Sequence, residues 1–212
     1  MKQYVAILMD PPWPERGGGR VKRGADRHYE VIRRKEHIRD VVLGSGVWNP
    51  APDCHLYLWT TNTYLPWALW LIEALGFQYK TNFPWTKPGR AGIGQYARGQ
   101  HELLLFATRG SGYAVRTEAR DVGSGYLFQQ PRVRDAWTGK VVHSAKPPRQ
   151  YELIQRRTAP GPRLEVFARG QHSAEWDVWG LEAPAPPTPT GQETARKAAQ
   201  ERGGGSETDP PF

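Results

Sequence analysis

The chain has 212 residues, of which 38% are hydrophobic and 11% aromatic, which is enough for one domain with its own core and excludes a disulfide mini-protein. Its 29 Lys and Arg residues against 21 Asp and Glu give a formal charge of +8, so we expect an acidic partner. The single cysteine, Cys54, lies in an apolar stretch, which predicts a buried thiol and excludes a cysteine-based zinc site. The longest mostly apolar stretch is too short to cross a bilayer, so we expect a cytoplasmic protein with no membrane partner.

Composition divides the chain after residue 182. Residues 183–212 are rich in Pro, Gly, Ala and Thr, which predicts a disordered tail after a folded domain over residues 1–182. Within that domain, Arg16–Arg39 holds nine basic and three acidic residues and begins near three consecutive glycines, which favours a basic loop over residues 14–39. A second basic segment, interrupted by Gly and Pro, predicts a long loop over residues 110–145.

The predicted regular elements alternate between strands and helices. Apolar runs of strand length, and apolar residues at helical spacing, predict strands over Tyr4–Met9, Cys54–Thr60, Phe77–Trp85, Glu102–Thr108 and Arg163–Arg169, and helices over Leu65–Leu75 and Pro148–Thr158. This order is typical of an α/β protein with an open, mostly parallel sheet flanked by helices. Ligands of such sheets bind outside the carboxyl ends of the strands, so we searched those ends for chemistry.

The first predicted strand ends in Asp10-Pro11-Pro12-Trp13. One interpretation is structural, because two prolines make a stiff turn and Trp13 could cover the core. The other is catalytic, because a carboxylate, a free backbone carbonyl and an aromatic face together suit the amino group of a nucleobase. Hydrogen bonds to Asp10 and the Pro11 carbonyl would make that nitrogen a better nucleophile, and Trp13 would stack on the ring. This hypothesis predicts that Asp10→Ala or Trp13→Ala abolishes the reaction and leaves the fold intact.

The motif resembles the DPPW signature of the N6-adenine methyltransferase family typified by the catalytic subunit of the eukaryotic mRNA N6-adenosine methyltransferase, which has bacterial and phage members. The resemblance covers about residues 4–180. Further landmarks follow in order: His28-Tyr29, Leu58-Trp59-Thr60-Thr61-Asn62, Gly76-Phe77, Tyr79-Lys80-Thr81, Arg98-Gly99-Gln100-His101-Glu102-Leu103-Leu104, His143-Ser144-Ala145-Lys146-Pro147, Glu165-Val166-Phe167-Ala168-Arg169 and Trp176-Asp177-Val178-Trp179-Gly180.

The resemblance implies a Rossmann-like fold that binds S-adenosylmethionine. It implies catalytic roles for Asp10, Pro11, Pro12 and Trp13. Arg and Lys side chains suit the cofactor's carboxylate, and a carboxylate suits its ribose hydroxyls. The implied cofactor-binding residues are Asp10, Lys146, Glu165, Phe167, Arg169, Gln171 and His172. The chain departs from the family pattern at Leu181 and at Gln171-His172, so the ribose and adenine contacts are the less specific part of this assignment.

The basic loop after the catalytic motif is the expected place for the nucleic acid. Basic side chains there would hold phosphates, and Tyr29 would contact the target base, although a solvated loop tyrosine is the alternative. The predicted substrate-binding residues are Trp13, Arg16, Lys22, Arg23, His28 and Tyr29. His101-Glu102 is either a polar edge at the cleft or a buried pair, and the histidine spacing predicts no metal site.

We therefore expect an S-adenosylmethionine-dependent enzyme that methylates N6 of adenine in nucleic acid, with DNA favoured over RNA by analogy with compact bacterial and phage members. A catalytically silent nucleic-acid-binding subunit is the alternative from another class, but such subunits have lost the acid or the aromatic residue of the motif. Methylation of the cytosine amino group uses similar chemistry, and Asp10 favours adenine. A homodimer or a heteromeric partner is compatible with the sequence.

Overall fold

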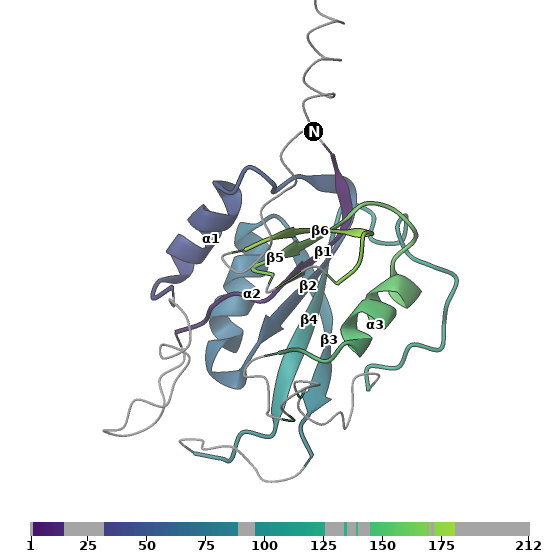
Figure 1. Cartoon of the computed structure of the whole chain (residues 1–212). Coiled ribbons are helices and arrows are strands. Elements are labelled where there is room, and N and C mark those ends of the chain that lie inside the picture. Colours follow the sequence, from purple (N-terminus) through teal and green to yellow (C-terminus); the bar gives the residue numbers. More distant parts are fainter. Residues whose placement is uncertain are drawn as a thin grey trace, which may run out of the picture.

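The computed structural model describes residues 2–14, 32–88, 96–125, 134, 139, 145–168, 170 and 172–180, and these residues build a six-stranded sheet (Figure 1). The strands lie in the order β3-β4-β2-β1-β5-β6. The pairs β2–β1, β1–β5 and β5–β6 are parallel, whereas β4 is antiparallel to both β2 and β3. The bounds are β1 Tyr4–Met9, β2 Pro50–Thr60, β3 Gln78–Thr86, β4 His101–Arg109, β5 Arg163–Val166 and β6 Trp176–Trp179. The mixed sheet confirms the predicted α/β class, with an antiparallel pair at one edge.

Helices cover both faces of the sheet (Figure 1). The helices α1 (Lys35–Leu43) and α2 (Leu65–Ala74) lie on one face, and α3 (Arg149–Arg157) lies on the other. A short 3-10 turn, η2 (Asn62–Tyr64), leads from β2 into α2. None of the helices in the described ranges combines the length and the apolar composition needed to cross a bilayer.

Side-chain alternation along the strands divides the core into two clusters. Ile7 and Met9 pack toward α1 and α2, whereas Ala6 and Leu8 pack toward α3. Because successive strand residues point to opposite faces, the continuous apolar runs of β1 and β2 fill both layers at once. The buried Cys54 belongs to the first cluster, as predicted from its apolar surroundings.

The structure corrects the sequence-based prediction at two elements and shortens a third. The predicted loop over residues 14–39 ends sooner, because α1 begins at Lys35 and buries Ile38 and Val42. Those two apolar residues are four positions apart on one helix face. The charged residues on either side of Ile38 obscured this helical spacing in the sequence. The four-residue β6 was not predicted. The fifth strand ends at Val166, because Phe167 has a φ of 63°, which strand backbone does not adopt.

A buried hydrogen-bonded network lies at the end of the sheet opposite the predicted site. The Nε2 atom of His55 lies 2.8 Å from the Gly112 carbonyl, and its Nδ1 lies 2.8 Å from the Thr158 hydroxyl. Because a carbonyl only accepts, Nε2 carries a proton. Burial lowers the pKa of the ring, which keeps it neutral near pH 7, so Nδ1 accepts from Thr158, whose oxygen is 3.0 Å from the Tyr57 hydroxyl.

We predict that stability falls in mild acid because of this histidine. Burial lowers the pKa of His55 from 6.5 to about 4; the Gly112 carbonyl opposes that shift, and the charge of Arg157 adds to it. The unfolded chain binds the proton first, so the contribution is complete above the unfolded pKa and is lost as pH falls toward 4. The loss is about 3 kcal/mol. Urea unfolding measured across this range should show a shallower pH dependence in His55→Asn than in the parent, and parallel curves would contradict the assignment.

Candidate active site

Four charged side chains meet at the edge of the sheet where β1 and β2 end and the antiparallel β4 begins. Asp10 directly follows β1, Lys87 directly follows β3, and Glu102 is the second residue of β4. Glu102 is two residues from Leu104, which packs toward α3, so alternation directs its carboxylate to the α3 face. Asp10 is likewise two residues from Leu8, which also packs toward α3, so its carboxylate is directed to the same face.

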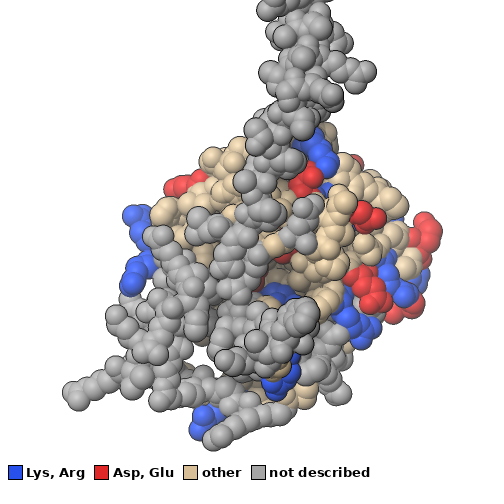
Figure 2. Space-filling view, in the orientation of Figure 1, with Lys and Arg blue, Asp and Glu red and all other residues tan. Residues whose placement is uncertain are grey.

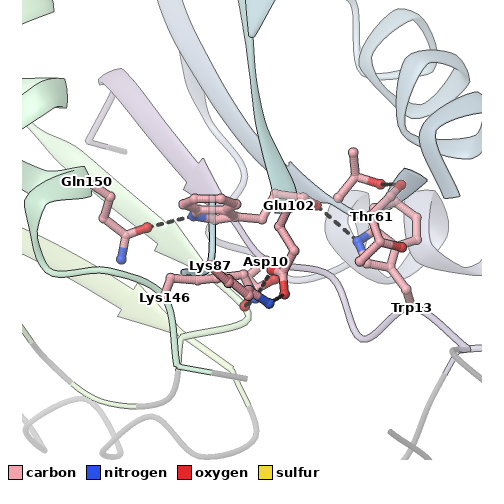
Figure 3. Close-up of polar contacts among 9 residues, drawn as sticks. Asp10, Trp13, Thr61, Lys87, Glu102, Lys146 and Gln150 are labelled. Atoms are coloured by element: carbon pink, nitrogen blue, oxygen red, sulfur yellow. Dashed lines mark hydrogen bonds and ion pairs between the residues drawn. The ribbon is translucent and has the colours of Figure 1, made fainter. Parts of the chain in front are cut away.

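Lys146 joins these groups into one ion-pair network (Figure 3). Its Nζ donates to Asp10 Oδ2 at 2.7 Å and lies 3.5 Å from Glu102 Oε2. Lys87 donates to the other oxygen of Glu102. The Lys146 side chain is 11% exposed and its ammonium lies 5.7 Å from the centre of the Trp59 ring. The network therefore holds Asp10 in place from segments that are distant in the sequence.

Electrostatics keep Glu102 ionised within this network. Burial raises the pKa of the Glu102 carboxyl, but the ammonium groups of Lys146 and Lys87 and their hydrogen bonds outweigh it, so the net shift is downward. A negative Glu102 in turn holds Lys146 beside Asp10. Of the two alternatives for His101-Glu102, the structure supports a polar edge at the site, because His101 is exposed and the Glu102 side chain is 16% exposed.

A pocket of about 190 Å³ opens beside this network, between the strand ends and α3. Leu8, Trp59 and Glu165 alternate with residues that pack toward α1 and α2, which directs all three side chains to the α3 face. The pocket is lined by Leu8, Asp10, Trp59, Ala145, Lys146, Pro148, Gln150, Tyr151, Glu165, Phe167, Gly170 and His172. It therefore combines two acids, one lysine and several aromatic walls.

Glu165 lines this pocket, and its carboxyl has a raised pKa. Burial raises the pKa of its carboxyl to about 7, the hydrogen bond from Tyr151 opposes the shift, and the negative charge of Asp10 adds to it. Tyr151 Oη donates to Glu165 Oε2 at 2.9 Å. A carboxyl that titrates near neutral pH inside a pocket is a functional-site candidate.

The pocket wall beyond Glu165 depends on an unusual backbone turn. Phe167 adopts the left-handed conformation at φ 63°, and its ring packs edge-on against Trp179 at 5.7 Å. Gly180 makes this turn fit, because a Cβ at that position would lie 2.6 Å from the Ala168 carbonyl oxygen. The closing glycine of the sequence motif is therefore explained by close backbone packing against the turn.

Trp13 is placed differently from the hypothesis drawn from sequence. It is 5% exposed, its indole N–H donates to the Trp59 carbonyl at 2.9 Å, and its ring stacks on Tyr64 at 5.8 Å. Figure 3 shows it apart from the cluster around Asp10 and Lys146. Trp13 packs in the cluster on the α1 and α2 face. This geometry does not support the expectation that Trp13→Ala leaves the fold intact, whereas a contact with the target base stays a prediction.

The structure brings together Asp10 and four of the predicted cofactor-binding residues, since Lys146, Glu165, Phe167 and His172 all line the pocket. Pro11 and Pro12 form the turn after β1, in which the Trp13 N–H donates to the Pro11 carbonyl at 2.8 Å. The remaining predicted residues lie outside the described residues: Arg16, Lys22, Arg23, His28, Tyr29, Arg169 and Gln171.

Sequence reasoning missed several residues of the site. Lys87, Trp59, Gln150 and Tyr151 were not assigned to it, although each contacts the ion-pair network or lines the pocket. Strand alternation could have identified Trp59, which shares a strand face with the buried Tyr57. Within the described ranges, no group of three or more His, Cys, Asp or Glu side chains is arranged to hold a metal ion.

Two comparisons relate the sequence of this chain to known proteins. A family model described as MT-A70 matches residues 4–182. The chain is also similar to the Type II methyltransferase M.MunI from Mycoplasma sp., with 31% identity over 208 residues that cover 86% of this chain and 79% of that protein. The match to the family model includes every charged and aromatic residue of the site described above.

Proposed function

The chain belongs to the MT-A70 family and is a methyltransferase for N6 of adenine, and we propose that its substrate is DNA, that Asp10 is the catalytic carboxylate, and that the methyl donor binds in the pocket beside it. The observation that carries this proposal is the pairing of Asp10 with Lys146 at 2.7 Å, in the lining of a pocket with aromatic walls. An amino nitrogen next to that carboxylate would meet a fixed, negatively charged acceptor.

The amino nitrogen of adenine is a weak nucleophile because it shares its lone pair with the ring. N–H bonds donated to Asp10 and to the second lone pair of the Pro11 carbonyl, which already accepts from the Trp13 N–H, favour a pyramidal, more nucleophilic nitrogen. Lys146 fixes the carboxylate before the substrate arrives, so that little reorganisation is required during the reaction. The nitrogen loses one proton when its new bond to carbon forms, and we assign Asp10 as the first acceptor of that proton.

The donor set of the pocket fits S-adenosylmethionine, which methyltransferases use in general and which supplies a methyl group bound to positively charged sulfur. Asp10 and Glu165 complement its positive charges and its hydroxyl donors, while Trp59 and Tyr151 offer apolar walls. Among the described residues, Lys146 is the cation at the pocket that suits the cofactor's carboxylate. Phe167 and His172 complete the binding surface, and Arg169 and Gln171 are assigned to it by family resemblance.

A basic surface adjoins the catalytic turn. The Ile32 N–H donates to the Pro12 carbonyl at 3.2 Å, which holds the entry of α1 beside the turn that follows Asp10. Arg33 and Arg34 are exposed at this entry, and in Figure 2 Lys and Arg side chains project where α1 lies. Such side chains hold phosphates without reading sequence. This surface supports a nucleic acid substrate, and similarity to a Type II methyltransferase favours DNA.

Transfer of a labelled methyl group to matched polymers tests the choice of substrate. The purified full chain is incubated with labelled S-adenosylmethionine and with duplex DNA, single-stranded DNA or RNA pools of the same mixed sequence. We expect label in the DNA pools and less than a tenth of that label in RNA. Label confined to RNA would overturn the DNA assignment and retain the enzyme, whereas no label in any pool would overturn the proposed function.

A further inference from the structure

Two hydrogen bonds fix the start of α3 against the sheet beside the pocket. The indole N–H of Trp59 donates to Gln150 Oε1 at 2.6 Å, and the next residue, Tyr151, donates through its hydroxyl to Glu165 Oε2 at 2.9 Å. Because an indole N–H can only donate, the Gln150 oxygen must face Trp59. The first bond joins α3 to β2, and the second joins α3 to β5.

Packing against two aromatic rings fixes the Tyr151 ring beside Glu165. The His172 ring stacks on it at 3.7 Å with an angle of 3° between the planes, and Trp176 meets it edge-on at 5.4 Å. Gln150, the preceding residue, is 4% exposed. Burial and the negative charge of Glu165 both raise the pKa of the Tyr151 hydroxyl, so it remains a protonated donor throughout the neutral range. These contacts restrict rotation of the Tyr151 side chain and hold its hydroxyl toward Glu165.

Glu165 receives this donor on one oxygen only. Its Oε2 accepts from Tyr151, and no described residue donates to its Oε1, although the carboxyl lines the pocket. The charged and titratable groups around it are Asp10 after β1, Lys146 before α3, Tyr151 on α3 and His172 after β5, while β6 places the uncharged Val178 beside it. A carboxylate with one oxygen fixed and the other open to a pocket is ready to accept hydrogen bonds from a ligand.

We propose that Tyr151 is a positioning residue that presents Glu165 to the donor groups of the methyl donor, and that the bond between Trp59 and Gln150 holds the turn of α3 that carries Tyr151. The proposal rests on the proposed function, which supplies the ligand: a nucleoside with ribose hydroxyls and an ammonium group. When these donors reach Glu165, the carboxyl releases its proton to solvent. Binding therefore tightens as pH rises through the pKa of the free protein, about 7.

Calorimetric titration of the full chain with S-adenosylhomocysteine, the demethylated cofactor, tests the proposal without any catalytic turnover. Titrations from about pH 5.5 to about pH 8.5, in two buffers of different ionisation enthalpy, give both the Kd and the number of protons released. We expect the parent to bind more tightly as pH rises, with a midpoint near pH 7 and net proton release. Glu165→Gln should give a flat profile with no released proton.

Tyr151→Phe removes the hydroxyl and keeps the ring between His172 and Trp176. Loss of a hydrogen bond to an ionised carboxylate should move the midpoint upward by about one pH unit and weaken binding near neutral pH about tenfold. A ring with only a structural role would weaken binding equally at every pH. Tyr79→Phe is the matched control, because Tyr79 is 38% exposed on β3 and should give the parent profile.

The outcomes separate this proposal from the proposed function. An unchanged midpoint and Kd in Tyr151→Phe, with a flat profile in Glu165→Gln, would overturn the role of Tyr151 and leave the methyltransferase assignment in place. Absence of binding by the parent at every pH would overturn both. If circular dichroism shows that Tyr151→Phe is unfolded, 3-fluorotyrosine in place of Tyr151 replaces it. Its more acidic hydroxyl is a stronger donor to Glu165, so the midpoint should move downward, and an unchanged midpoint would count against the proposal.

Discussion

Replacing Asp10 by asparagine is expected to lower the kcat of methyl transfer about a thousand-fold, near the upper end of what loss of one preorganised electrostatic group costs. Asparagine keeps the size of the side chain but removes the charge that faces Lys146 and the acceptor assigned to the substrate amino group. Initial rates at saturating DNA and S-adenosylmethionine measure the effect directly.

The fold should survive this change, because Lys146 retains its second partner, Glu102, at 3.5 Å. Asp40→Asn is the matched control, since Asp40 is an exposed acid on α1 that pairs with the adjacent Arg39. We expect the control to keep the parent kcat. A kcat for Asp10→Asn within threefold of the parent, in protein with an unchanged circular dichroism spectrum, would contradict the role given to Asp10.

Truncation of Trp13 is expected to have the largest effect on stability. The side chain is 5% exposed, packs on Tyr64 and donates to the Trp59 carbonyl, so Trp13→Ala removes core packing and leaves a buried carbonyl without its donor. Substitutions of this kind cost about 3–5 kcal/mol. For a chain of this size the thermal midpoint should fall by about 10 °C or more.

Differential scanning calorimetry and urea unfolding measure this loss. Trp13→Phe is the companion variant, because it keeps an aromatic ring against Tyr64 and loses the hydrogen bond together with the smaller part of the indole, with an expected cost of about 1–3 kcal/mol. A thermal midpoint for Trp13→Ala equal to that of the parent would show that Trp13 is not the core residue described above. Activity of Trp13→Phe then reports on the indole without the damage to the fold.

The fold was predictable where apolar residues fill both sides of a strand. The runs at Tyr4–Met9 and Cys54–Thr60 belong to β1 and β2, whose side chains enter both core clusters, so their composition alone indicates central strands. The opposite holds for α1, where Ile38 stands among charged residues and the helix buries only Ile38 and Val42. Its apolar signal was too small to separate the helix from the basic segment before it.

Some members of the site were predictable from the sequence, but the contacts between them were not. Asp10 stood out because an acid before two prolines at the end of a buried strand has few structural reasons to be there. Lys146 lies 136 residues away, and only the family resemblance singled it out. Its pairing with Asp10 depends on how α3 packs on the sheet, as does the contact of Tyr151 with Glu165, and no local pattern encodes either distance.

Mass-spectrometric analysis of nucleosides from duplex DNA tests whether the protein methylates N6 of adenine and whether Asp10 carries the reaction. DNA is incubated with S-adenosylmethionine and either the parent protein or Asp10→Asn, then digested to nucleosides. We expect N6-methyldeoxyadenosine with the parent and at most a trace with Asp10→Asn. Methylation of cytosine instead of adenine, or equal amounts of N6-methyldeoxyadenosine from the two proteins, would contradict it.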